Sequence, residues 1–285
     1  MINKIIFLIN VIVVINFNCI YAQQKDSSSS DINYYKLGAL GAVTVGAFVY
    51  SYALQNDLWW KGEKSKFHFE WDYDWKYALG SDKFGHFYFP NLFTTIYSDA
   101  LQWTGIDENK SLIYAASVAL LHQTYTEIQD GFSKKWGFSW GDFTANTLGA
   151  SYPLLQKRFA VLQNFDFKIS YFPSERFKNH SHKVIIDDYE STYNWLSINV
   201  YNFLPGNIKK YYPAFVNLAL GYSVKKLDFP DEAYREVFIG LDWNFEALPG
   251  ESEFLKKLKK YLNFYHFPAP AVRISPGVIW YGLKF

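Results

Sequence analysis

The chain has 285 residues, of which 49% are apolar, 21% are aromatic and only 19% are charged. This length accommodates one large domain or two modest ones. Many aromatic residues with few charges are typical of proteins that meet a membrane, where Trp and Tyr lie between lipid and water. Basic and acidic side chains number 28 and 27, so no positive excess is available for a phosphate backbone, and we expect no nucleic-acid partner.

The first residues are typical of an export signal. Lys4 precedes an apolar run, and Ala22 ends a stretch suited to cleavage. We predict a signal peptide over residues 1–22 and a polar, serine-rich linker over residues 23–32. The alternatives are a retained anchor helix and a lipid attached to Cys19, the only cysteine. The expected location is the cell envelope, at the outer membrane or at the periplasmic face of a membrane.

Residues 33–157 predict a helical domain. Four helices are expected, over residues 37–54, 82–103, 110–130 and 139–155. The first is uncharged and long enough to span a membrane, and the alternative is a buried helix of a soluble domain. Ser139, three residues before Asp142, is the expected N-cap of the last helix, in which Gly149 and Ala150 allow close packing. An interfacial belt, or a lid over a site, is predicted for Trp59, Trp60, Trp71 and Trp75.

Residues 158–285 predict a β-rich region. Alternation with a period of two marks strands within residues 167–172, 215–224, 237–245 and 278–285. An amphipathic, Lys-rich helix is predicted over residues 251–264, and Pro268 and Pro270 indicate a rigid extended connector after it. The aromatic C-terminus resembles the ending of outer-membrane β-barrel proteins, but the strands are fewer than the roughly eight of the smallest such barrels. The predicted fold class is α+β, with an N-terminal four-helix, membrane-associated bundle before this region.

Three of the predicted helices each carry a polar pair at helical spacing. The pairs are Asp82 with His86, Glu127 with Asp130, and Asp142 with Asn146. Ionisable groups in such apolar helices are costly unless they pair or line a cavity. We therefore expect the three pairs to face one common site.

Four interpretations of this site remain open. Asp82, His86 and Glu127 offer oxygen and imidazole ligands for a divalent metal. His86 beside carboxylates also suits acid–base catalysis, and Lys83 with His86 suits an anionic head group. The fourth interpretation is a polar network that only locks the helices together. For catalysis we predict His86, Glu127, Asp130 and Asp142, with substrate bound by Lys83 and Asn146.

The motifs in this region resemble known families. The segments that carry the resemblance are Asp82-Lys83-Phe84-Gly85-His86, Glu127-Ile128-Gln129-Asp130-Gly131 and Trp140-Gly141-Asp142 with Asn146 and Gly149. They resemble the YfiM-like family, uncharacterised bacterial envelope proteins predicted to be lipoproteins. Their order is also similar to that of VanZ-like membrane proteins, linked to glycopeptide resistance. The resemblance covers roughly residues 35–157 and implies a compact helical membrane domain with a polar centre, but no mechanism.

Two functions are expected on these grounds. The first is a structural or assembly role in the outer envelope, with membrane lipid and other envelope proteins as partners. The second is a hydrolase or transferase that acts on a lipid-linked envelope substrate through the His and carboxylate residues.

Overall fold

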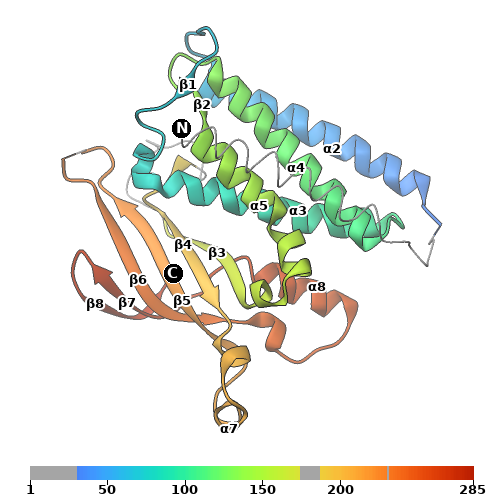
Figure 1. The fold of residues 1–285 in the computed structure, drawn as a ribbon, viewed down its shortest axis with the longest axis vertical. Coiled ribbons are helices and arrows are strands. Elements are labelled where there is room, and N and C mark those ends of the chain that lie inside the picture. Colours follow the sequence, from blue (N-terminus) through green and yellow to red (C-terminus); the bar gives the residue numbers. More distant parts are fainter. Residues whose placement is uncertain (1–30, 174–186, 230) are drawn as a thin grey trace. The chain divides into compact units, whose positions relative to one another are not determined.

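The computed structural model describes residues 31–173, 187–229 and 231–285 and divides the chain into two compact units (Figure 1). The first unit contains residues up to 76 together with residues 86–155. The second contains residues 77–85 and 156–285. The predicted α+β class is confirmed. The domain boundaries and the membrane-associated bundle stay predictions, and the predicted signal peptide with Cys19 lies outside the described residues.

Long helices supply most of the first unit. They are α2 (Tyr34–Gln55), α3 (Ser81–Trp103), α4 (Glu108–Gly131) and α5 (Trp140–Arg158). Polar residues cap two of them, because Asn33 accepts the Lys36 N–H at 3.0 Å and Asp107 accepts the Asn109 N–H at 2.8 Å. A short parallel pairing of β1 (Phe69–Glu70) with β2 (Phe138–Ser139) ties the aromatic loop to the start of α5. All four helix predictions are confirmed to within three residues at each end.

Helix α2 is held by one side only. Thr44 Oγ1 donates to the Tyr97 hydroxyl of α3 at 3.1 Å, and Ser51 Oγ lies 3.2 Å from His122 Nε2 of α4. Its other sides are exposed. Within the described residues, the stretch Tyr34–Trp60 is the one helix long and apolar enough to cross a membrane, and 0% of its most apolar window is buried.

Helices α3 and α5 approach each other closely at Gly149. A Cβ at this position would lie 2.0 Å from the carbonyl oxygen of Phe87. Next to it, Thr94 Oγ1 donates to the Ala150 carbonyl at 3.2 Å. The predicted close packing at Gly149 and Ala150 is therefore confirmed, and only glycine fits at position 149.

The second unit is built on a six-stranded antiparallel sheet in the order β3-β4-β5-β6-β7-β8. Its strands are β3 (Phe165–Tyr171), β4 (Thr192–Ile198), β5 (Val216–Lys225), β6 (Tyr234–Trp243), β7 (Ala269–Ser275) and β8 (Ile279–Lys284). Helix α8 (Glu253–Leu262) lies between β6 and β7 in the chain, as predicted, and a short helix α7 (Gly206–Lys209) precedes β5. Among the described residues no ladder joins β8 to β3. The other edge of β3 is partly covered by a parallel bridge between Ile169 and Tyr265.

The predicted rigid connector at Pro268 and Pro270 is wrong, because Pro270 lies inside strand β7. Proline cannot donate to a ladder and is tolerated in strands at bulges. The register between β7 and β8 shifts between Ala269 and Ala271, which places Pro270 at such an irregularity. Strand β4 was not predicted either.

One face of this sheet, which we call the interior face, is buried yet rich in polar residues. Its fully or almost fully buried polar residues are Lys168, Ser170, Ser197, Asn217, Ser223, Glu236 and Asp242. Lys168 Nζ lies 2.6 Å from Asp242 Oδ2, and His266 Nδ1 lies 2.9 Å from Asp242 Oδ1. The His266 ring also stacks on Trp195 at 3.9 Å between centroids. A buried Asp is thus flanked by two nitrogen-bearing partners, which offsets its loss of hydration.

Replacing Lys168 by methionine is expected to destabilise the second unit by about 3–5 kcal/mol, because Asp242 would lose its buried cation. The matched control is Lys226→Met, which removes an exposed pair with Glu232 and is expected to cost less than about 1 kcal/mol. Denaturant unfolding followed by Trp fluorescence measures both. Equal losses in the two variants would contradict the account of the interior face.

Candidate functional site

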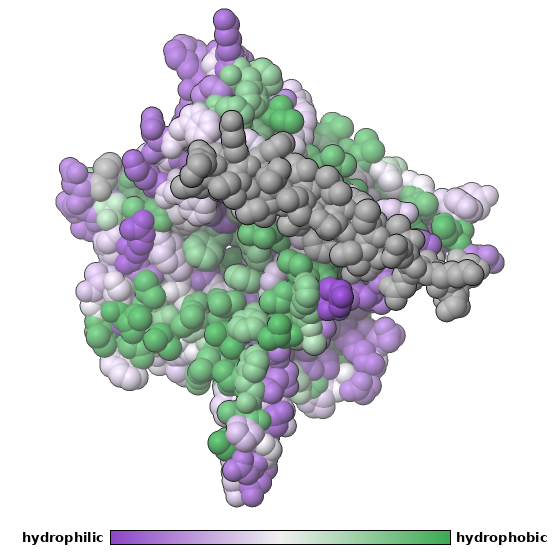
Figure 2. All heavy atoms as spheres, in the orientation of Figure 1, coloured by the Kyte–Doolittle hydropathy of each residue, from purple (hydrophilic) through white to green (hydrophobic). Residues whose placement is uncertain are grey.

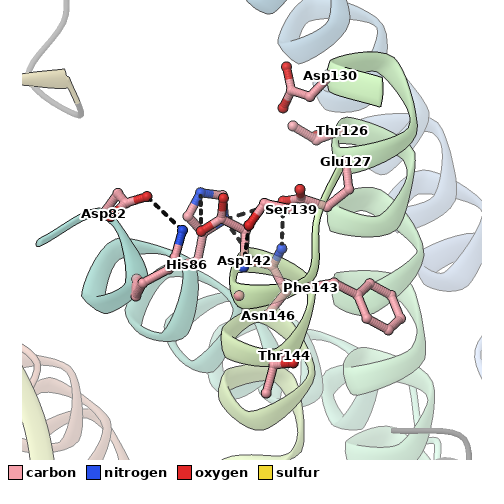
Figure 3. A network of polar contacts seen from close by, with 12 residues as sticks. Asp82, His86, Thr126, Glu127, Asp130, Ser139, Asp142, Phe143, Thr144 and Asn146 are labelled. Carbon is pink, nitrogen blue, oxygen red and sulfur yellow. Dashed lines mark hydrogen bonds and ion pairs between the residues drawn. The ribbon is translucent and has the colours of Figure 1, made fainter. Parts of the chain in front are cut away.

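Three helices of the first unit bring one His and two carboxylates together (Figure 3). His86 comes from α3, Glu127 from α4 and Asp142 from α5, and one ligand atom of each lies within 4.8 Å of the others. Glu127 is 1% exposed, whereas His86 and Asp142 have side chains 26% and 14% exposed. The group is therefore buried on one side and open to solvent on the other.

Asn146 links His86 to Glu127. Its Nδ2 donates to Glu127 Oε1 at 3.1 Å, and its Oδ1 lies 3.2 Å from His86 Nδ1. A carboxylate accepts and does not donate, so the amide nitrogen faces Glu127 and the amide oxygen faces the imidazole. The Nδ1 atom of His86 must then carry a proton and donate it to Asn146.

The second ring nitrogen of His86 faces a carboxylate. Its Nε2 lies 3.5 Å from Asp142 Oδ1. With the proton of a neutral ring on Nδ1, the Nε2 lone pair would face a negatively charged oxygen, which is unfavourable. Either a second proton or a cation between the two atoms removes this repulsion.

A loop residue fixes the start of α5, and with it Asp142. Asp74 accepts the Ser139 hydroxyl at 2.6 Å and the Gly141 N–H at 3.0 Å. Ser139 Oγ in turn accepts the Asp142 N–H at 2.8 Å, as expected for the predicted N-cap. Two side-chain oxygens thus satisfy the first N–H groups of α5, and the Asp142 carboxylate starts from a fixed backbone.

Asp130 lies one turn after Glu127 on α4 and accepts the indole N–H of Trp60 at 2.7 Å. Burial raises the pKa of Asp130 to about 6, against the smaller opposing effects of the Trp60 hydrogen bond and the charge of His86. Trp60 itself is 2% exposed, so its predicted place in an interfacial belt is wrong. Trp71 and Trp75 are exposed, at 58% and 62%.

The raised pKa of Asp130 predicts a pH dependence of stability. The carboxyl binds its proton more tightly when folded, at about 6, than at its ordinary value of 3.8. Folding therefore costs more as the pH rises through this window, by up to about 3 kcal/mol for the roughly two units. We expect Asp130→Asn, which still accepts from Trp60, to be more stable than the parent above pH 6 and equal to it below pH 4. Unfolding curves across this range test the difference, and parallel curves would contradict it.

Asp82 and Lys83 lie outside this group. Lys83 Nζ lies 3.0 Å from Asp82 Oδ2, and both side chains are at least nine-tenths buried. Both belong to the second unit, whereas His86 belongs to the first. The sequence predicted Asp82, His86 and Glu127 as metal ligands. Among the described residues, the carboxylate that joins His86 and Glu127 is Asp142, not Asp82. The roles of all these residues stay predictions.

Asp74 was not anticipated from the sequence, because it lies in a loop with no periodic pattern. Trp60 was predicted as part of an interfacial belt or of a lid over a site, but its hydrogen bond to Asp130 was not. Asn146 was anticipated, as the partner of Asp142 at helical spacing. Its hydrogen bond to Glu127 joins α5 to α4, and the sequence of neither helix indicates such a contact.

Residues 70–158 match the model of a family described as a predicted periplasmic lipoprotein, a domain of unknown function (DUF2279). This chain is an exported protein of the cell envelope. The match runs through α3, α4 and α5 and includes His86, Glu127, Asp142 and Asn146. It supports the expected likeness to an uncharacterised envelope lipoprotein family, while the likeness to the YfiM-like and VanZ-like families stays a prediction. No curated protein and no solved structure matches the chain.

Proposed function

We propose that this envelope protein binds one divalent cation with His86, Glu127 and Asp142 and uses it for hydrolysis or group transfer on a lipid-linked envelope substrate. The observation that carries the proposal is the convergence of these three ligand atoms within 4.8 Å. The competing candidate is that the same residues form a polar network without catalytic activity.

The donor set and its spacing suit a divalent cation. Imidazole nitrogen and carboxylate oxygen bind zinc at about 2.0–2.2 Å, so two ligands of one tetrahedral ion lie roughly 3.4 Å apart. His86 Nε2 and Asp142 Oδ1 are 3.5 Å apart. An ion there would remove the repulsion between the Nε2 lone pair and the carboxylate.

The partner of Nδ1 supports the same assignment. Imidazoles that bind metals usually donate their other N–H to a carbonyl, a carboxylate or water, which fixes the ring. Here the Asn146 amide oxygen lies 3.2 Å from Nδ1, and Glu127 holds the amide from behind. Nε2 is thereby left as the ligand atom.

The chemistry follows from the class of site. A divalent cation would act as a Lewis acid on a carbonyl or phosphoryl oxygen. Asp130, whose pKa of about 6 leaves part of it protonated near neutral pH, suits a proton donor to a leaving group. The exposed helix α2, which carries no charged residue after Lys36, packs on α3 and α4. In this proposal it lies in the membrane, so that α2 to α5 form a membrane-associated bundle that meets a lipid-anchored substrate.

The test is turnover by the purified full chain in detergent. Lipid-linked phosphate and saccharide substrates would be offered with zinc, manganese or magnesium, and product release would be measured. We expect metal-dependent cleavage of at least one substrate, loss of cleavage in Glu127→Gln, and full activity in the surface control Asp72→Asn. Cleavage that survives both chelation and Glu127→Gln would contradict the proposal.

A structural or assembly role in the outer envelope is the second candidate. The hydrogen-bonded chain from Glu127 through Asn146 to His86 favours it, because such a chain also locks three helices together. In that case His86→Ala would lower the free energy of unfolding by several kcal/mol and would melt far below the parent. Added metal would not change the melting temperature of either protein.

A further inference from the structure

The sheet of the second unit carries polar and apolar residues on unusual faces. Its interior face is buried and combines polar residues with the cluster of Tyr193, Trp195 and Phe238, whereas the opposite face, which we call the outer face, presents apolar side chains to solvent. On β5, Leu218 and Leu220 are 42% and 47% exposed, while the alternating Asn217 and Ala219 are buried. Soluble sheets normally bury their apolar face.

One apolar row on the outer face crosses all six strands. The strand registers place side by side, in order, Phe167, Leu196, Leu220, Ile239, Val272 and Trp280. Leu220, Ile239 and Trp280 are exposed, at 47%, 46% and 79%, whereas Phe167, Leu196 and Val272 are half-buried. A row of this length is larger than scattered surface apolar residues explain and marks a surface that meets an apolar phase or a partner. Figure 2 shows apolar residues gathered over the strands in this view.

The apolar outer face cannot instead be the face that forms the core of this unit. The core is already formed by side chains of the interior face. Lys168 and His266 pair with Asp242 there, and the Trp195 ring packs against His266 and Phe238. Alternation with polar residues inside and apolar residues outside is the pattern of strands that face lipid.

Helix α8 adds the charge that an anionic membrane surface would attract. Its lysines are Lys256, Lys257, Lys259 and Lys260. On the same helix, Phe254 is 73% exposed, and Leu255 and Leu258 are 38% and 39% exposed. A basic helix with an exposed apolar side suits the boundary between anionic head groups and acyl chains.

We propose that the outer face of strands β3–β8 lies in the apolar layer of an anionic lipid bilayer, with α8 at the surface of that bilayer. The location of the chain in the cell envelope makes such a surface available. This inference is independent of the proposed metal site, because it uses only residues of the second unit.

Spin labels on single cysteines test this in the full chain, reconstituted in vesicles on a Cys19→Ser background. Labels at Leu220→Cys and Ile239→Cys report the outer face, and a label at Asp231→Cys reports the exposed turn between β5 and β6. Oxygen concentrates in acyl chains, whereas a nickel chelate stays in water. We expect the outer-face labels to collide often with oxygen and rarely with the nickel chelate. The Asp231 label should collide often with the nickel chelate and less often with oxygen. Circular dichroism confirms that each labelled chain is folded.

Two other outcomes would overturn the proposal. Nickel collisions at Leu220 and Ile239 equal to those at Asp231 would place the outer face in water. Protection from both reagents would mean that protein covers this face, either a second copy or another envelope protein.

A label at Phe254→Cys tests the charge on α8. We expect it to be protected from nickel in vesicles that contain phosphatidylglycerol and to be exposed in pure phosphatidylcholine. Equal protection in the two lipids, or none in either, would overturn the part assigned to the lysines.

Discussion

Replacing Gly149 by valine is expected to prevent the first unit from folding. A Cβ at this position would lie 2.0 Å from the Phe87 carbonyl oxygen and 2.8 Å from its carbon, so α3 and α5 would have to separate. The clash is with backbone and cannot be relieved by a rotamer change, and we expect a loss of more than about 3 kcal/mol. Separation of these helices would also move His86 away from Asp142. Denaturant unfolding in detergent, followed by circular dichroism, measures the effect.

Gly46→Val on α2 is the matched control, because a Cβ there meets nothing within 4 Å. It is expected to change the free energy of unfolding by less than about 1 kcal/mol. If Gly149→Val and Gly46→Val unfold alike, the close approach of α3 and α5 is not what stabilises this unit.

Replacing Asp142 by asparagine is expected to lower the affinity for a divalent cation by about 100-fold or more, since even changes behind the ligands usually cost 10- to 100-fold. The amide keeps the size of the side chain and removes its charge. The Ser139 hydroxyl accepts the backbone N–H of residue 142, so the start of α5 should persist. Calorimetric titration with zinc or manganese measures the affinity.

Asp82→Asn distinguishes the structure from the sequence prediction, which named Asp82 as a ligand. Asp82 pairs with Lys83 and is not one of the three converging groups. We expect Asp82→Asn to bind the cation as the parent does. Loss of binding in Asp82→Asn and its retention in Asp142→Asn would restore the ligand set expected from the sequence.

The helices were predictable from the sequence because their signals are local. Apolar residues recur at helical spacing, and Ser139 stands where a cap is expected. The polar pairs on the same helices pointed to a shared site, and the structure does bring His86, Glu127 and Asp142 together. Which carboxylate joins His86 depends on helix rotation and packing distance, and a single sequence carries neither.

The sheet was harder to predict, for two physical reasons. Strand β4 alternates poorly, because Tyr193 and Trp195 fill the interior while Leu196 and Ile198 lie on the other face, so both faces look apolar. Strand β7 contains Pro270 at a register shift, and a proline in a sequence argues against a strand at that position. Alternation in β6 was visible, but alternation alone does not say that the polar face is the buried one.

Pulsed electron paramagnetic resonance on the full chain loaded with one equivalent of copper or manganese tests the central claim most directly. The account predicts one tightly bound ion per chain, coupled to the nitrogen of one imidazole, and loss of that coupling in His86→Gln with the helices still folded. An ion that shows no imidazole coupling in the parent chain, or a coupling that survives His86→Gln, would contradict it. His86, Glu127 and Asp142 would then be a polar network that joins α3, α4 and α5.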